Sequence, residues 1–349
     1  MNPNHKKTEQ QIALDSKFFD GIEQAKELIA EGQTFVIGVH ARPDPDAIGS
    51  ALALARGLRQ IGKDVTVISQ DGVPEMCEYL SDTEDVFTAV DIPAFDVAVI
   101  CDANELGGTG TASDVLKRAK SLLVIDHHIF KLSDAAVSEH ERLFEKIHYL
   151  VESKAASTAQ VVYELLVRID GIRIDKQMAE QLMAGVVGDT GAFRFSNVDA
   201  WVFRTAAALA ENGAGVEEAV RGIFDRSLTN ARLLGAALLA AQISEDGKVV
   251  WSSITMEDFE KFHATDADTD NISNALRDIR GVRVGILFRE IEPEQIRISL
   301  RSRDGVDVNR IARVFGGGGH MSASGCTVKA PLEDAQRQVL AEVRACMES

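Results

Sequence analysis

Eight acidic and imidazole side chains could carry chemistry, because most of them come directly after apolar runs. Asp126, His127 and His128 follow the run 122–125. The full set is His40, Asp44, Asp46, Asp102, Asp126, His127, His128 and Asp189. Carboxylates and neutral imidazoles bind divalent metal ions. The set therefore predicts a metal site, provided that the fold brings these distant residues together.

A parallel sheet would position them. Apolar runs predict strands that alternate with helical patterns, which is typical of a doubly wound α/β domain. The predicted strands are 35–39, 65–69, 95–101 and 122–125, and the predicted helices are 18–29, 46–60, 75–80, 113–119, 156–169 and 175–187. Parallel strands bring their carboxyl ends to one edge of the sheet. Seven of the eight side chains follow such ends, and Asp189 follows the last helix.

The convergence creates an electrostatic problem. Two carboxylates about 4 Å apart repel by roughly 4 kcal/mol at an effective dielectric constant near 20. Four of them, Asp44, Asp46, Asp102 and Asp189, must take up protons or bind cations. Two divalent ions balance four aspartates, and oxygen and imidazole ligands without thiolate favour manganese, with magnesium as the alternative, over structural zinc. A pair of ions about 3.5–4 Å apart is an arrangement used for attack on phosphorus.

Each residue also has a purely structural interpretation. Asp44 or Asp46 could cap a helix, Asp102 could lie in a solvated turn, and Asp189 could form an Asx turn. His40 could be an ordinary histidine at a strand end. The metal-site interpretation is favoured because all of these alternatives would have to hold at once while His127 and His128 were also idle.

The second half of the chain predicts a connector and a smaller domain. Residues 199–241 are nearly all helical in pattern, whereas residues 131–154 give no clear pattern. The predicted strands that follow are 248–254, 282–289, 295–301 and 324–329, with helices at 256–263, 271–279, 307–315 and 332–347. The boundaries expected from this are a catalytic domain at 16–197, a helical connector at 198–235 and an α+β domain at 236–349, with a cleft between the two domains.

This second part offers groups that could bind an anion. The run 316–319 is four glycines, which form either a flexible connection or a backbone that presents N–H groups to phosphate. Arg301 and Arg303 alternate on a predicted strand and are either solvated charges or substrate contacts. Arg194, shortly after Asp189, is a further candidate for anion binding.

Composition limits the partners. The 349 residues carry a net charge of −17, which argues against a long nucleic-acid track but not against a small anionic substrate. Neither a bilayer-spanning apolar run nor a secretory signal is visible, so a cytoplasmic protein without membrane association is expected. The four scattered cysteines suit a reducing compartment.

These motifs, in this order, resemble the DHH phosphoesterases. The first set comprises His40-x-x-x-Asp44-x-Asp46, Asp102, Asp126-His127-His128 and Gly188-Asp189-Thr190-Gly191. The second set, which resembles the DHH-associated C-terminal domain, comprises Asp307-Val308-Asn309-Arg310-Ile311-Ala312, 316–320 and Ala323-Ser324-Gly325. The resemblance covers about residues 18–345 and is nearest to the NrnA-type subgroup, which hydrolyses very short RNA and pAp.

The resemblance implies roles for single residues. One metal ion would be held by His40, Asp44 and Asp102, and the other by Asp46, Asp102, His127 and Asp189. Asp126 would orient a histidine, and His128 would lie beside the substrate phosphate. The implied substrate contacts are Arg301, Arg303, Asn309, Gly317, Gly318, Gly319 and His320. The chain departs from the family at Pro45, where relatives carry a small residue, and over 131–154.

The implied activity is hydrolysis of 5′-phosphorylated oligoribonucleotides of two to a few nucleotides, and of pAp to AMP. Alternatives within the family are a cyclic dinucleotide or pApA phosphodiesterase, a single-strand exonuclease of the RecJ type and a manganese pyrophosphatase. A nucleotide sensor without turnover is the alternative outside enzymes. Relatives also imply a homodimer formed through the metal domain.

Overall fold

The computed structural model describes residues 9–128 and 134–348. The chain forms two compact units, Met1–Asp225 and Arg226–Ser349, and each is described by itself. The boundary assigns the helices α7 (Ala200–Glu211) and α8 (Val216–Phe224) to the first unit and α9 (Leu228–Leu239) to the second.

The first unit is built on a six-stranded sheet in the order β3-β2-β1-β4-β5-β6, and every neighbouring pair is parallel. The strands are β1 (Thr34–Val39), β2 (Asp64–Ile68), β3 (Val86–Phe87), β4 (Phe95–Cys101), β5 (Ala119–Asp126) and β6 (Lys146–Val151). The predicted α/β class and its parallel sheet are confirmed. The edge strand β6 lies in the stretch that gave no clear pattern, because only one of its residues is fully buried.

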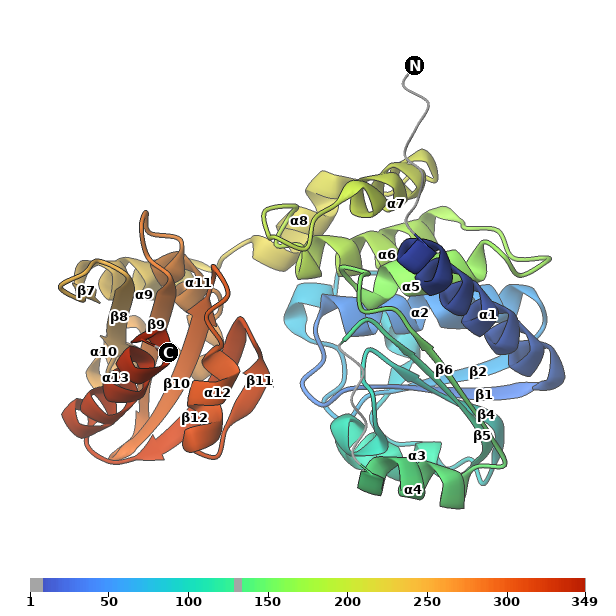
Figure 1. Cartoon of the computed structure of the whole chain (residues 1–349), viewed down its shortest axis with the longest axis horizontal. Helices are drawn as coiled ribbons and strands as arrows, with labels where there is room; N and C mark the ends of the chain where they lie inside the picture. The colour runs from blue at the N-terminus through green and yellow to red at the C-terminus, as the bar shows by residue number, and fades with distance from the viewer. Residues whose placement is uncertain (1–8, 129–133, 349) are drawn as a thin grey trace. The chain divides into compact units, whose positions relative to one another are not determined.

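Helices cover both faces of this sheet (Figure 1). One face packs against α1 (Glu9–Glu31), α2 (Pro45–Gln60), α5 (Thr158–Leu166) and α6 (Lys176–Asp189). The other face packs against the short elements η3 (Leu106–Ala112) and α3 (Ser113–Leu116) and residues at the end of α4 (Asp134–Leu143). Two further 3-10 turns are η1 (Glu75–Cys77) and η2 (Thr83–Asp85). The helices predicted at 75–80 and 113–119 are thus much shorter in the structure.

Helix α2 begins where the sequence places two prolines. The carboxylate of Asp44 accepts hydrogen bonds from the backbone N–H groups of Asp46 and Ala47, both at 3.0 Å, and so caps the helix. Pro45 occupies the first helical turn, where its missing N–H is not needed. Gly49 lets α2 approach α6 closely, since a Cβ there would lie 2.1 Å from the carbonyl oxygen of Gln181.

The strand order places the predicted ligands. Strands β1, β4 and β5 are neighbours, and their carboxyl ends lead into His40, Asp102 and Asp126 respectively. The chain continues from β1 to β2 on one side, whereas β4 and β5 lie on the other. The order therefore reverses between β1 and β4, and a crevice beyond the strand ends is the usual ligand position in such sheets.

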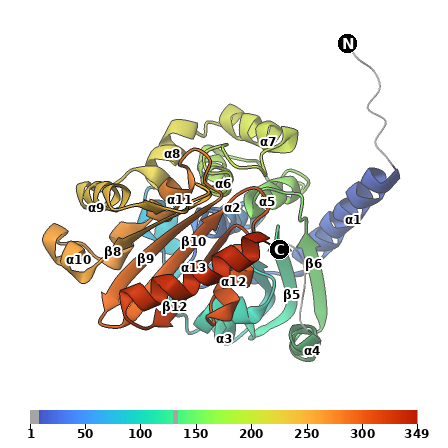
Figure 2. The ribbon, with the colours of Figure 1, turned by 60° about the vertical axis from the view of Figure 1, so that its left-hand side comes forward.

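The second unit is a mixed six-stranded sheet in the order β11-β12-β10-β9-β8-β7. Its strands are β7 (Gln242–Ile243), β8 (Val249–Ile254), β9 (Val284–Glu292), β10 (Gln295–Ser302), β11 (Gly318–His320) and β12 (Ala323–Lys329). Its other helices are α10 (Met256–Phe262), η4 (Asp266–Thr269), α11 (Ile272–Arg277), α12 (Val308–Val314) and α13 (Leu332–Glu348). One face packs against α12 and α13, and the other against α9 and α11 (Figure 2). The predicted smaller α+β domain is confirmed as a fold.

Among the residues that the structure describes, no helix is both long and apolar enough to cross a membrane.

Candidate metal centre

The eight predicted side chains of the first unit converge around Asp102. Its oxygen Oδ2 lies 3.5 Å from Nε2 of His40. Its other oxygen, Oδ1, lies 3.7 Å from Nε2 of His127 and 3.8 Å from Nδ1 of His128. Asp102 is buried and has a left-handed backbone with φ 61°, which is uncommon for a residue other than glycine. The two oxygens of the Asp102 carboxylate thus face two different groups of residues.

The first group consists of His40, Asp44 and Asp102, whose ligand atoms lie within 4.8 Å of one another. Nε2 of His40 is 3.9 Å from Oδ1 of Asp44. The other ring nitrogen, Nδ1, lies 2.9 Å from the carbonyl oxygen of Ala41. A proton on Nδ1 satisfies that contact and leaves the Nε2 lone pair directed toward the two carboxylates.

The second group consists of Asp46, His127 and Asp189, again with ligand atoms within 4.8 Å. Nε2 of His127 lies 3.1 Å from Oδ2 of Asp189 and 4.0 Å from Oδ2 of Asp46. Its Nδ1 faces the carbonyl oxygen of Ala155 at 3.3 Å. The side chain at the end of α6 and the side chain at the start of α2 therefore meet at one imidazole nitrogen.

Asp126 organises the turn that follows β5. Its Oδ1 accepts hydrogen bonds from the backbone N–H groups of His127, at 2.7 Å, and His128, at 3.2 Å. The same oxygen lies 2.7 Å from Nδ1 of His128. Asp126 therefore orients the His128 ring, while His127 is oriented by the Ala155 carbonyl.

The pKa values in this cluster are strongly displaced. Burial raises the pKa of Asp46 well above its ordinary value, and repulsion from Asp102 and Asp189 adds to this effect. Burial, opposed by pairing with His127, raises the pKa of Asp189 to about 6. Burial alone would lower the pKa of His127, but pairing with Asp189 and attraction to Asp102 and Asp46 raise it to about 11. Protons must therefore balance the carboxylate charge unless another cation does so.

The residues fit divalent metal ions. The Nε2 atom of His127 is buried and makes no hydrogen bond within the described chain, although three carboxylates surround it. A buried nitrogen in that position is suited to coordination. The donors are oxygen and imidazole nitrogen, and this combination suits manganese, magnesium or related ions.

Helix α5 contributes hydrogen bonds to the centre that were not predicted from the sequence. The backbone N–H groups of Thr158 and Ala159 donate to the two oxygens of Asp46, at 2.6 and 2.9 Å, and the Thr158 hydroxyl donates to Asp102 at 2.8 Å. Gly185 of α6 makes room for this arrangement, because a Cβ there would lie 2.4 Å from Oδ1 of Asp46. Only the pattern Ser157-Thr158, typical of a helix start, could have drawn attention to this segment.

Arg194 lies five residues beyond the end of α6 and belongs to the same unit. Its Nε donates to the carbonyl oxygen of Gly191 at 2.7 Å, and its guanidinium lies 6.0 Å from the ring centroid of Phe224. The structure thus gives Arg194 partners within its own loop and an aromatic neighbour.

In the second unit, the two predicted arginines have different surroundings. The Nη1 of Arg301 donates to the carbonyl oxygen of Leu300 at 3.0 Å, and no ion pair to Arg301 occurs among the described residues. Burial lowers the pKa of Arg301, and the nearby guanidinium groups of Arg277 and Arg289 lower it further. A cation in such surroundings would gain from an anionic ligand. Arg303 instead donates to the carbonyl oxygens of Val282 and Ile279, the latter at 2.9 Å.

Asn309 lies in the first turn of α12. Asp307 caps this helix by accepting hydrogen bonds from the N–H groups of Asn309 and Arg310, at 3.0 and 3.1 Å. The side-chain Oδ1 of Asn309 is buried and makes no hydrogen bond in the described part of the chain. This atom would be available to a ligand donor or to water.

The last two glycines of the run belong to the edge strand β11, where Gly318 pairs with Gly325 and Gly319 with Ser324, whereas Gly316 and Gly317 precede the strand. A Cβ at Gly317 would lie 2.2 Å from the carbonyl oxygen of Gly325. At Gly318 the space is open. The run thus allows close packing on β12 and leaves room at one position. The backbone of His320 belongs to β11, whereas its side chain lies outside the described part of the structure.

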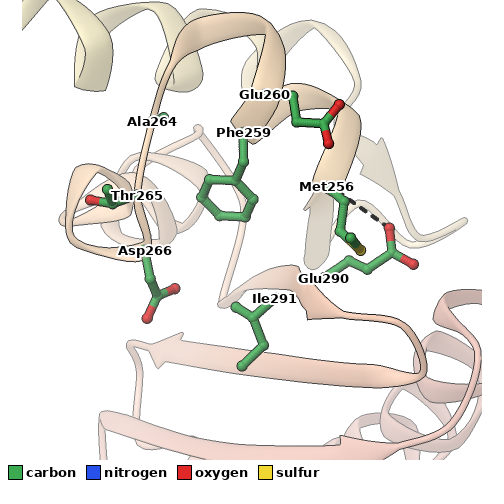
Figure 3. A pocket seen from close by; sticks show the side chains of 8 residues that line it. All are labelled: Met256, Phe259, Glu260, Ala264, Thr265, Asp266, Glu290 and Ile291. Carbon is green, nitrogen blue, oxygen red and sulfur yellow. Dashed lines mark hydrogen bonds between the residues drawn. The ribbon is translucent and has the colours of Figure 1, made fainter.

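A hollow of about 290 Å³ in the second unit includes none of the predicted contacts (Figure 3). Phe259 and Ile291 form an apolar part of its lining. Three carboxylates, from Glu260, Asp266 and Glu290, also line it. This acidic lining would repel a phosphate ester, so the hollow is a poor substrate site.

Comparison with known proteins agrees with this geometry. Residues 34–186 match the DHH family N-terminal domain, and residues 246–349 match the DHHA1 domain. The bifunctional oligoribonuclease and PAP phosphatase NrnA of Thermus thermophilus is 30% identical over 95% of this chain and 96% of its own. The cyclic-di-AMP phosphodiesterase PdeA of Listeria monocytogenes is 24% identical over 99% of this chain and 51% of its own.

A solved structure has the same fold. An exopolyphosphatase-related protein of Bacteroides fragilis superposes with a TM-score of 0.84 and 25% identity, covering 94% of this chain and 98% of that one. The family match, the near full-length likeness to NrnA and this shared architecture lead to one conclusion. The chain belongs to the DHH phosphoesterases that carry a DHHA1 domain.

Proposed function

We propose that this chain hydrolyses 5′-phosphorylated oligoribonucleotides of two to a few nucleotides to mononucleotides, and dephosphorylates pAp to AMP. The proposal rests mainly on the position of the Asp102 carboxylate, which we call divided because its two oxygens face different groups. Oδ2 faces the group that contains His40, and Oδ1 faces the group that contains His127. Similarity to NrnA over nearly the whole chain supports this substrate class.

Two divalent ions, with manganese preferred over magnesium, complete the proposed centre. His40, Asp44 and Asp102 would hold one ion. Asp46, Asp102, His127 and Asp189 would hold the other. When bound, the ions would lower the pKa of water and stabilise charge at phosphorus.

Side chains of the protein would orient the substrate and neutralise the charge of its phosphates. His128, held by Asp126, would lie beside the substrate phosphate and donate a hydrogen bond to it. Arg301 would bind a second phosphate of the substrate, because its guanidinium lacks an ion-pair partner among the described residues. Asn309 and the amide groups of 317–320 would contact the remaining polar groups of the nucleotide.

The test uses protein that has been freed of metal with a chelator and to which manganese, magnesium or zinc is then added. We expect manganese to restore release of mononucleotide from a 5′-phosphorylated dinucleotide and release of phosphate from pAp. If neither product forms with any of the three ions, the proposed function is wrong. The same assay on an Asp102→Asn variant controls for a contaminating nuclease.

The similarity to PdeA favours a second candidate, a cyclic dinucleotide or pApA phosphodiesterase. Competition among pApA, cyclic di-AMP, pAp and pyrophosphate in one assay separates these activities. Preference for cyclic di-AMP by tenfold or more in kcat/KM would replace the proposed substrate. Binding of nucleotide without turnover, with metal present, would instead indicate a sensor, which the complete set of ligand residues argues against.

A further inference from the structure

Thr158 contacts two of the candidate metal ligands at once. It is fully buried at the first position of α5. Its hydroxyl Oγ1 donates to Oδ1 of Asp102 at 2.8 Å, and its backbone N–H donates to Oδ2 of Asp46 at 2.6 Å. One residue therefore ties together carboxylates that come from the end of β4 and the start of α2.

The hydroxyl contact determines which way the Asp102 carboxylate is turned. The three imidazoles around Asp102 lie 3.5, 3.7 and 3.8 Å from its oxygens. The contact from Thr158 is shorter than all of these and has the usual length of an O–H···O hydrogen bond. A carboxylate shared by two groups must keep its plane fixed about the Cβ–Cγ bond, and this hydrogen bond opposes its rotation.

Thr158 is itself held rigidly. The side chain of Ser157 caps α5 by accepting a hydrogen bond from the N–H of Gln160 at 3.4 Å. Threonine is branched at Cβ and has few side-chain conformations. The adjacent N–H of Ala159 donates to the second oxygen of Asp46 at 2.9 Å. The start of α5 is thus fixed on both sides of the hydroxyl that contacts Asp102.

We infer that Thr158 is a positioning residue of the metal centre. Its hydroxyl directs one oxygen of Asp102 toward each metal group, and its amide fixes Asp46 in the second group. This inference rests on the proposed function, because it assigns a role within the same centre. It adds a residue that has no ligand atom in either group and acts only through Asp102 and Asp46.

The test is manganese binding to the full chain, measured by titration calorimetry on protein that has been freed of metal with a chelator. Thr158→Val keeps the amide and the shape but removes the hydroxyl. We expect it to weaken manganese affinity by about 10- to 100-fold, the usual effect of losing a partner of a metal ligand. Thr158→Ser restores a hydroxyl and should bind manganese within about threefold of the unaltered protein. Thr158→Ala provides a second loss of the hydroxyl should the valine variant fold poorly.

Thr109→Val is the matched control. Thr109 is also fully buried, but its hydroxyl donates to the carbonyl oxygen of Leu106 at 2.8 Å and not to a carboxylate. This variant should bind manganese as the unaltered protein does. A merely structural role for Thr158 would lower thermal stability without changing manganese affinity.

The outcomes distinguish the two proposals. If the unaltered protein bound no manganese, the manganese centre and with it the role of Thr158 would be refuted, whereas the proposed hydrolysis would still be decided by product release with magnesium or zinc. If it bound manganese and the hydroxyl-free variants bound it equally well, the role of Thr158 alone would be refuted. The same holds if the serine variant were as weak as the valine variant, because the hydroxyl would then not be the cause.

Discussion

The two units of this chain hold their charged groups in different ways. In the first, buried and partly buried carboxylates and imidazoles form small groups in which the ligand atoms lie within 4.8 Å of one another, so each side chain depends on its neighbours. In the second, guanidinium groups lie on strands β9 and β10, and pairing is incomplete. Arg289 and Arg297 share Asp266, at 2.7 and 2.6 Å, whereas Arg301 takes part in no ion pair among the described residues.

This difference indicates that the first unit is suited to the chemical step and the second unit to substrate binding. A buried cluster of opposite charges changes strongly when one member is removed, because the others lose their compensation. A partly paired guanidinium can gain an anionic partner without rearranging its neighbours. Substitutions in the first unit should therefore act on turnover, and substitutions at Arg301 should act on substrate binding.

Asp102→Asn should have the largest effect. Asparagine lacks the charge that both groups share, and its NH2 group cannot replace the second ligand oxygen. The loss of several kcal/mol of transition-state stabilisation corresponds to a fall in kcat of roughly 10³-fold. Mononucleotide release at saturating manganese gives the rate, and circular dichroism verifies the fold. Asp96→Asn, at the other end of the same strand β4, is the matched control and should retain turnover. Normal turnover of Asp102→Asn would refute the role of the divided carboxylate.

Arg301→Ala should have the second-largest effect, and the effect should be on substrate binding. Losing a charged hydrogen-bond donor costs about 1.5–3 kcal/mol, so KM for the 5′-phosphorylated dinucleotide should rise by roughly 10- to 100-fold. We expect kcat and manganese affinity to stay near those of the unaltered protein. Arg337→Ala, an exposed arginine of α13 in the same unit, is the control. If Arg301→Ala lowered kcat while KM stayed constant, the division between chemistry and binding would be wrong.

Arg303→Ala should instead reduce stability. Its guanidinium donates to the carbonyl oxygens of Val282 and Ile279. The Ile279 oxygen also accepts the N–H of Val282, so the substitution deprives the Val282 carbonyl of its hydrogen bond, at a cost of about 1–3 kcal/mol. Urea denaturation, with hydrogen exchange of amides in the second unit as the readout, measures the loss of unfolding free energy. Arg344→Ala, exposed on α13, should change little. Unchanged stability of Arg303→Ala would show that the Val282 carbonyl is satisfied in another way.

Asp96→Asn should have the smallest effect, near 1 kcal/mol of unfolding free energy. Hydrogen bonds from the amides of Thr34 and Gln33, and then from Lys120, hold the pKa of Asp96 below its ordinary value. The folded pKa is below the unfolded one, so the stabilisation is present above about pH 4 and is lost as the pH falls further. The stability difference between the two proteins should therefore be constant above about pH 5 and shrink as the pH falls from about 4.5 to below 3. A difference that grew on acidification would contradict this sign.

Much of the fold and the candidate site could be predicted from the sequence. Continuous apolar runs indicate strands buried on both faces, and polar residues at their ends show where the sheet edge lies. The residues around Asp102 could thus be grouped before any coordinates were known. Strand β6 escaped prediction because Lys146 and His148 interrupt its pattern. Nothing in the glycine run indicated that its last two residues pair in strand β11.

The sequence by itself determined which groups could bind metal and that four carboxylates require compensating charge. Only the tertiary structure decided how those groups are held. The hydroxyl of Thr158 reaches Asp102 across 56 residues, and its amide reaches Asp46 across 112. Such contacts depend on where α5 packs against α2, and local periodicity carries no information about that distance. For the same reason only the folded chain distinguishes Arg301, which lacks an ion pair among the described residues, from Arg303, which is bound to backbone carbonyls.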